Sequence, residues 1–140
     1  MRRPIHLTFL AIVAVAVTTW ACGDAEVATP TSPTTPTTTT ETFSDNLTPS
    51  GAKTFPFEAL AGTVTATLTS LGPDSTLSIG MSLGTWSGTV CQIVLRNDNA
   101  VQGSVVTGTV SAAGNLCLSV YDAAGQLVEP IAFVVTVVHP

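Results

Sequence analysis

Side chains able to do chemistry are few in this 140-residue chain. It has three cysteines, Cys22, Cys91 and Cys117, and of its two histidines His139 stands beside the C-terminus. A catalytic serine or cysteine needs a nearby base, and acid–base catalysis by carboxylates needs a pair, whereas the carboxylates here stand singly. Zinc sites need several Cys or His ligands, and no CxxC pair occurs. We therefore expect no catalytic residue, no metal site and no cofactor.

Cys22 follows a segment typical of an export signal. Arg2 and Arg3 precede an apolar run that ends in small residues at Ala21, and the run is shorter than the ~20 residues that span a bilayer. The segment resembles the lipobox of bacterial lipoproteins, in which the cysteine is diacylated and becomes the mature N-terminus. The resemblance implies a signal peptide over residues 1–21 and lipid attachment at Cys22. Ordinary cleavage after Ala21, which would release a soluble protein, is the alternative.

Cys91 and Cys117 remain as a pair once Cys22 is assigned to lipid. Export to an oxidising compartment favours a disulfide between them, and closing a loop of about 26 residues would stabilise the fold by roughly 3–4 kcal/mol. Two free buried thiols are the alternative, which is the usual state in a cytosolic protein. The predicted disulfide therefore depends on the predicted extracytoplasmic location.

Trp86 is the candidate ligand-binding residue. It stands in Gly84-Thr85-Trp86-Ser87-Gly88, where a glycine-flanked loop would let the ring stack on a sugar or on a partner side chain. The alternative is a ring folded over the end of the domain. The Asn97-Asp98-Asn99 segment offers oxygen ligands for calcium, but one carboxylate is few for such a site, and a plain turn is the simpler interpretation.

The charge of the chain excludes nucleic acid as a partner. Removal of the signal takes Arg2 and Arg3, which leaves Lys53 and Arg96 against nine acidic residues. Such a chain cannot neutralise several phosphates, and anionic lipid surfaces repel it. Any membrane attachment must come from an N-terminal lipid.

Residues 22–42 are predicted to form a tether. Proline and threonine dominate this stretch, which has too few apolar groups to offset the entropy cost of ordering, so we expect a disordered linker.

From residue 43 to residue 140 the apolar residues alternate with hydroxyl residues, as in half-buried strands. We expect the segments 63–69 and 76–83 to form a hairpin, and strand 131–138, apolar on both parities, to be covered on both faces. If Leu116 and Leu118 face the core, strand parity places Cys117 on an outer sheet face or at an edge, and a bulge that would bury it is the alternative. Seven or eight short strands predict an all-β domain, an antiparallel β-sandwich.

The order of these features resembles the bacterial pre-peptidase C-terminal (PPC) domain. The resemblance lies in Thr54–Phe57, Gly62–Leu68, Pro73–Leu77 and Ala113–Tyr121. It implies a jelly-roll-like sandwich with a non-catalytic accessory or binding role. Together with Cys22, this predicts a lipid-anchored, extracytoplasmic protein that binds or scaffolds an envelope protein or polysaccharide on the periplasmic or cell-surface side. A secreted sugar- or polymer-binding module is the alternative.

Overall fold

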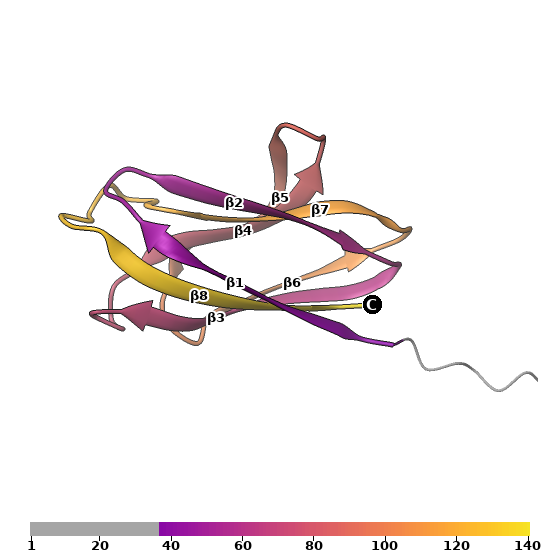
Figure 1. Cartoon of the computed structure of the whole chain (residues 1–140), viewed down its shortest axis with the longest axis horizontal. Coiled ribbons are helices and arrows are strands. Elements are labelled where there is room, and N and C mark those ends of the chain that lie inside the picture. The colour runs from indigo at the N-terminus through magenta and orange to yellow at the C-terminus, as the bar shows by residue number, and fades with distance from the viewer. Residues whose placement is uncertain (1–36) are drawn as a thin grey trace, which may run out of the picture. The chain divides into compact units, whose positions relative to one another are not determined.

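The computed structural model describes residues 37–140, and all of its regular elements are strands (Figure 1). In chain order they are β1 Thr39–Leu47, β2 Ala52–Ala59, β3 Gly62–Gly72, β4 Ile79–Trp86, β5 Cys91–Ala100, β6 Val105–Val110, β7 Gly114–Tyr121 and β8 Ile131–His139. Within residues 37–140 no helix is long and apolar enough to span a membrane.

The strands form two four-stranded antiparallel sheets, in the orders β1-β8-β3-β6 and β2-β7-β4-β5. The strands pair from the two ends of the domain inwards: β1 with β8, β2 with β7, β3 with β6 and β4 with β5. One long hairpin wound around itself has this pairing. This is the pairing of an eight-stranded jelly roll, and the predicted β-sandwich is confirmed. The two sheets lie face to face with the core between them (Figure 1).

The core consists of the alternate apolar side chains of both sheets. The largest fully buried members are Phe133, Leu47, Leu68, Ile79, Met81, Leu118 and Ile131. Threonine and serine occupy many of the opposite positions, which is the period-two pattern that predicted the strands.

Two expectations about the strands were wrong. Segments 63–69 and 76–83 belong to opposite sheets, because β3 pairs with β6 and β8 whereas β4 pairs with β5 and β7. Strand β8 is covered on one face only, and Val138 is exposed. β-Branched residues suit a pleated strand even where one face meets solvent, so valine at both parities did not indicate two-sided burial.

The domain also begins earlier than residue 43, where the tether was predicted to end. Strand β1 starts at Thr39, so residues 39–42 pair with Val137, Val138 and their neighbours in β8. Because β1 is an edge strand with an exposed face, residues 39–42 carry few apolar side chains and show no hydrophobic alternation. The rest of the predicted tether, and the signal segment, lie outside the described residues.

Candidate binding cleft between the β5 and β6 edges

The disulfide between Cys91 and Cys117 ties the β4–β5 hairpin to the sheet. The sulfur atoms are 2.10 Å apart and the Cα atoms 5.8 Å apart. Cys117 is fully buried, although its neighbours Leu116 and Leu118 are the ones that face the core, so it lies on the outer face of its sheet, as strand parity predicted. Gly84 is the register partner of Cys117, and the bridge joins the two strands that flank β4.

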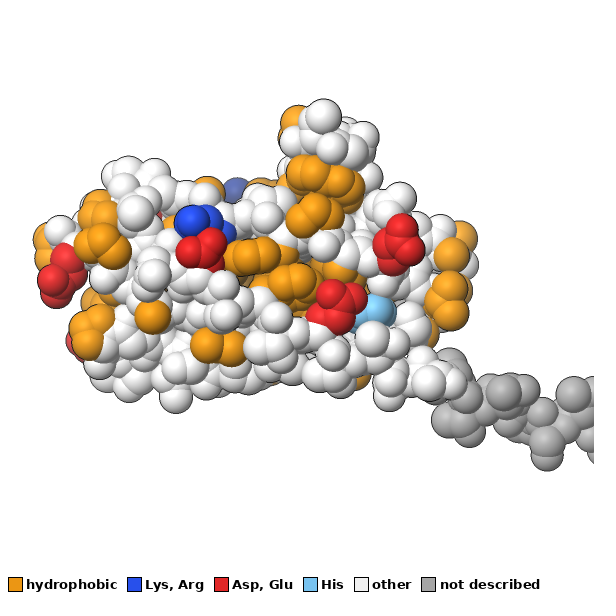
Figure 2. All heavy atoms as spheres, in the orientation of Figure 1, with side chains coloured by type: hydrophobic (Ala, Val, Ile, Leu, Met, Phe, Trp, Pro, Cys, Tyr) orange, Lys and Arg blue, Asp and Glu red, His pale blue; other side chains and the backbone are white. Residues whose placement is uncertain are grey.

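Gly84 is needed where β5 crosses closely over β4. A Cβ atom at this position would lie 2.2 Å from the backbone oxygen of Gln92, which is far inside van der Waals contact. The end of the hairpin therefore bends away from the sheet plane and projects from the sandwich, beside the β5 label in Figure 1. Hydrophobic side chains gather at the base of this projection (Figure 2).

Trp86 is the last residue of β4 and lies opposite Cys91, at the start of the projecting turn. It belongs to a strand end, not to the flexible loop that was expected, because Ser87 N–H donates to Val90 and closes the turn beyond it. The ring is partly buried and does not line the cleft described below. Its role in binding stays a prediction.

Strand β5 is an edge strand with an unusual run of exposed apolar residues. Ile93, Val94 and Leu95 are 49%, 69% and 38% exposed. Val94 has no register partner, since Leu83 pairs with Leu95 and Gly84 with Ile93, so Val94 is the extra residue of a β-bulge. The bulge breaks the strict alternation of β5, and large apolar side chains reach the surface at successive positions.

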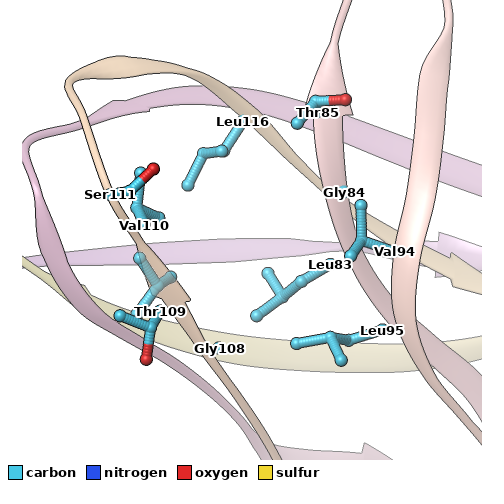
Figure 3. A pocket seen from close by; sticks show the side chains of 11 residues that line it. Leu83, Gly84, Thr85, Val94, Leu95, Gly108, Thr109, Val110, Ser111 and Leu116 are labelled. Atoms are coloured by element: carbon cyan, nitrogen blue, oxygen red, sulfur yellow. The ribbon is translucent and has the colours of Figure 1, made fainter.

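An apolar cleft opens where β5 and β6, the edge strands of the two sheets, approach each other. It encloses about 240 Å³. Leu83, Leu95 and Leu116 lie around it together with Val110 from β6, and their side chains face one another across the gap (Figure 3). The other lining residues are Val64, Gly84, Thr85, Val94, Gly108, Thr109 and Ser111. None of these side chains is charged.

Gly108 of β6 allows Leu95 of β5 to pack closely beside the cleft. A Cβ atom there would come within 2.7 Å of Leu95 Cδ1, so the missing side chain leaves room for Leu95. The cleft beside this contact is a concave apolar surface with a few threonine and serine side chains, which is the usual form of a binding site.

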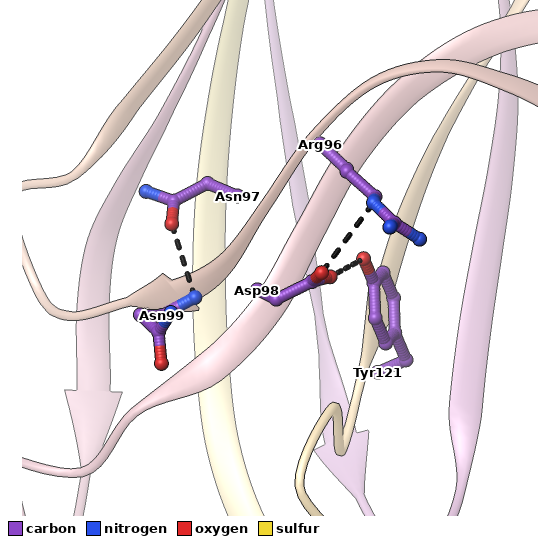
Figure 4. A network of polar contacts seen from close by, with 5 residues as sticks. All are labelled: Arg96, Asn97, Asp98, Asn99 and Tyr121. Carbon is purple, nitrogen blue, oxygen red and sulfur yellow. Dashed lines mark hydrogen bonds and ion pairs between the residues drawn. The ribbon is translucent and has the colours of Figure 1, made fainter.

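A polar network holds the far end of β5 (Figure 4). Tyr121 Oη donates to Asp98 at 2.5 Å, and Arg96 Nε lies 3.4 Å from the same carboxylate. Burial of the ring, followed by its hydrogen bond to Asp98, raises the pKa of Tyr121 to about 12. The ring lies against Gly80, where a Cβ atom would be 2.2 Å from it. The network thus fastens β5 to β7 across β4.

The sequence favoured a plain turn at Asn97-Asp98-Asn99. The segment instead lies within β5. Asn97 Oδ1 accepts from the backbone N–H of Asn99 at 3.0 Å, and the only carboxylate is already paired with Tyr121 and Arg96. In residues 37–140 no group of three or more His, Cys, Asp or Glu residues is placed to hold a metal ion.

His139 lies at the opposite edge, packed against Phe57, with 5.4 Å between ring centroids. Its Nε2 atom lies 3.0 Å from Glu41 Oε1, and in Figure 2 the histidine lies beside an acidic side chain. A second hollow of about 640 Å³ adjoins this pair. Threonine, glutamate, alanine and proline line much of it, and no cysteine or serine does.

The cleft could not be predicted from the sequence because it depends on strands far apart in the chain. The available signal was Ile93-Val94-Leu95, three successive apolar residues where alternation should have continued. The exposed apolar surface of β5 lies on residues smaller than Trp86, namely Ile93, Val94 and Leu95. Cys22 lies outside the described residues.

No protein-family model and no curated protein matches the chain. The chain is similar to a solved structure of Aeromonas hydrophila PliG, described as a periplasmic lysozyme inhibitor of g-type lysozyme. The TM-score is 0.52 at 18% sequence identity, over 70% of this chain and 83% of that chain. At this identity the likeness concerns the fold, which in both proteins is rich in β-structure.

Proposed function

We propose that the chain is an extracytoplasmic, non-catalytic binding protein that holds a protein partner at the β5–β6 edge, tethered to a membrane through lipid on Cys22. The apolar cleft carries the proposal: it is lined without charge and bordered by exposed Ile93 and Val94. Buried binding pockets that receive large partner side chains contribute most of the energy of protein interfaces.

Four further observations support the location and the class. The Cys91–Cys117 disulfide suits an oxidising compartment. The neighbour of similar fold is described as a periplasmic inhibitor, which is a protein that acts by binding. The lipobox-like segment before Cys22 favours attachment, since two acyl chains hold a protein firmly where one gives marginal binding. The resemblance to the PPC domain points to the same accessory role.

The binding proposal is tested by photo-cross-linking in intact envelopes. A photoreactive residue at Thr109, on the rim of the cleft, should give a discrete protein adduct that mass spectrometry identifies, whereas the same residue at Thr42 on β1 should not. Val94→Lys should reduce the Thr109 adduct at least about tenfold, because a charge then borders the apolar cleft. Val128→Lys is the matched control, since Val128 is 93% exposed and lies in the β7–β8 loop. Equal labelling at Thr109 and Thr42, or equal effects of the two lysines, would overturn the proposal.

The neighbour's target suggests the first candidate partners. Inhibition of g-type lysozyme by the purified chain, lost in Val94→Lys and kept in Val128→Lys, would identify the partner class directly.

The attachment is tested separately by Cys22→Ser. The variant should no longer incorporate a tagged fatty acid and should leave the membrane fraction. Equal labelling of wild type and variant would contradict lipidation and favour cleavage after Ala21 with release of a soluble protein.

A second candidate function is binding of a sugar or polymer through Trp86. The partly exposed ring at the base of the projecting turn favours it, since aromatic rings stack on sugar faces. Trp86→Ala should then weaken co-sedimentation with insoluble peptidoglycan and leave the unfolding midpoint unchanged. A large loss of stability would instead make Trp86 a structural cap.

A further inference from the structure

The two strands beside the cleft differ in their capacity to accept another strand. Strand β5 is irregular at two places, at Val94 and again near Asp98, where Ile79 pairs with Ala100 but Met81 with Asn97. Bulges on an edge strand twist it away and block further pairing. The edge of β5 is thus protected although its side chains are apolar.

Strand β6 is regular. Its six residues pair with β3 in unbroken register from Val105 to Val110, and β3 is its only strand partner among the described strands. Its other side therefore presents unpaired backbone N–H and C=O groups, with no lysine, proline or bulge to block pairing. This free side of β6 borders the cleft, because Gly108, Thr109 and Val110 line it.

We propose that β6 accepts an extended, positively charged segment of a partner protein as an additional strand of its sheet. Alternate side chains of that segment would point into the cleft against Leu83, Leu95 and Leu116, and the others would lie on the outer face beside Thr107 and Thr109. Main-chain hydrogen bonds would supply affinity, and the cleft would select apolar residues at every second position. This mode of binding rests on the proposed function.

The charge of the domain identifies the occupant as a basic partner segment. Between residues 37 and 140 there are two basic and seven acidic side chains, and both basic ones are paired, Lys53 with Asp45 and Arg96 with Asp98. A second copy of the chain would carry the same excess negative charge and be repelled. The chain's own Thr/Pro segment is a poor strand, because proline lacks the N–H that pairing requires, and Val27 is its only large apolar residue.

The test uses the full mature chain and a synthetic peptide in which valine and threonine alternate between lysines at both ends. Two N-methylated versions are compared, one methylated on the odd and one on the even backbone positions. Strand addition uses the N–H groups of one parity only, so one version should lose at least about tenfold in affinity and the other less than about twofold. Because composition and the number of methyl groups are the same, each peptide is the control for the other.

Two further readouts sharpen the result. Hydrogen exchange should slow at those β6 amides that are not bonded to β3, and not at β1, the edge strand at the other end of the sheet. Replacing the terminal lysines by glutamates should weaken binding about tenfold at low salt, and the difference should shrink at high salt.

Equal loss of affinity for both methylated peptides, no protection in β6, or no binding of the lysine-flanked peptide would overturn strand addition. The proposed function has its own readout, the adduct at Thr109 in envelopes. A specific adduct without peptide binding would leave a protein-binding cleft that works by another mode, whereas loss of that adduct would remove the proposed function itself.

Discussion

The two sides of this sandwich, where edge strands of the two sheets meet, differ in how the gap between the sheets is filled. On the side where β1 meets β2, aromatic rings close the gap between the sheets: Phe43 stacks on Phe55 with 5.2 Å between centroids, and Phe55 meets Phe133 edge-on at 6.1 Å. A salt bridge of 2.9 Å from Lys53 to Asp45 joins β2 to β1. Where β5 meets β6, small and aliphatic residues leave a cleft, and no aromatic stack or ion pair between residues of these two strands is present in the described part of the chain.

The difference teaches where this domain can interact. The β1–β2 side carries the features that discourage pairing with another chain, namely Glu41, Asp45, Lys53, Pro56 and Glu58. On the β5–β6 side the charged residues Arg96 and Asp98 stand at one end of β5, beyond the apolar run. The packing of the β1–β2 side stabilises the fold. The β5–β6 side exposes an apolar surface that the stability of the fold does not require.

The largest expected effect on the free energy of unfolding comes from a substitution on the β1–β2 side, which we call the closed side. The β5–β6 side is the open side. Phe57 is buried and contacts Phe43 at 6.1 Å between ring centroids, so Phe57→Ala should lower the free energy of unfolding by about 3–5 kcal/mol. Val94→Ala on the open side should change it by less than about 0.5 kcal/mol, because that side chain is largely exposed. Urea denaturation of both variants measures the contrast. Similar losses at the two positions would contradict the distinction between the sides.

Removal of the disulfide should have the next largest effect. Cys91→Ser combined with Cys117→Ser should lower the free energy of unfolding by about 2–5 kcal/mol. Amide exchange should accelerate in β5 and the projecting turn more than in β1, since the bridge fastens only the open side. Two alkylatable thiols in the folded, unreduced wild type would show that the bridge does not form.

Tyr121→Phe should cost about 1 kcal/mol by removing the hydrogen bond to Asp98. The pKa of Tyr121 is raised to about 12 from 10.0, so the neutral ring contributes stability in full below pH 10, and the contribution is lost as the pH rises towards 12. The stability advantage of wild type over Tyr121→Phe should therefore disappear in strong base. Ultraviolet titration of the tyrosine with a midpoint near 10 would be the contrary result.

The smallest effect is expected at the ion pair of the closed side. The hydrogen bond from Lys53, then that from the backbone of Asn46, holds the pKa of Asp45 below 3.8. The depressed pKa stabilises the fold above 3.8, and this contribution is lost as the pH falls through the lowered value. The thermal midpoint of wild type should exceed that of Asp45→Asn slightly at neutral pH and low salt, and the two should converge in acid. Because the group is exposed, salt should also remove the difference.

The sequence by itself determined the class of fold and the pairing of two cysteines. Alternation of apolar and hydroxyl residues predicted an all-β sandwich, since side chains on a strand point to opposite faces at period two. Cysteine number and strand parity predicted the Cys91–Cys117 bridge and its place on an outer face. The lipid on Cys22 stays a prediction from sequence.

Tertiary structure decided the neighbours of each strand, and with them the cleft. A period of two says which face of a strand is buried but not which strand lies beside it, so residues 63–69 and 76–83 looked like a hairpin and instead joined opposite sheets. The polar strand β1 became visible only through its pairing with β8. Val94, Leu95 and Gly108 line one cleft because β5 and β6 are the edge strands of different sheets on the same side of the sandwich, and that geometry follows from contacts between residues distant in the chain.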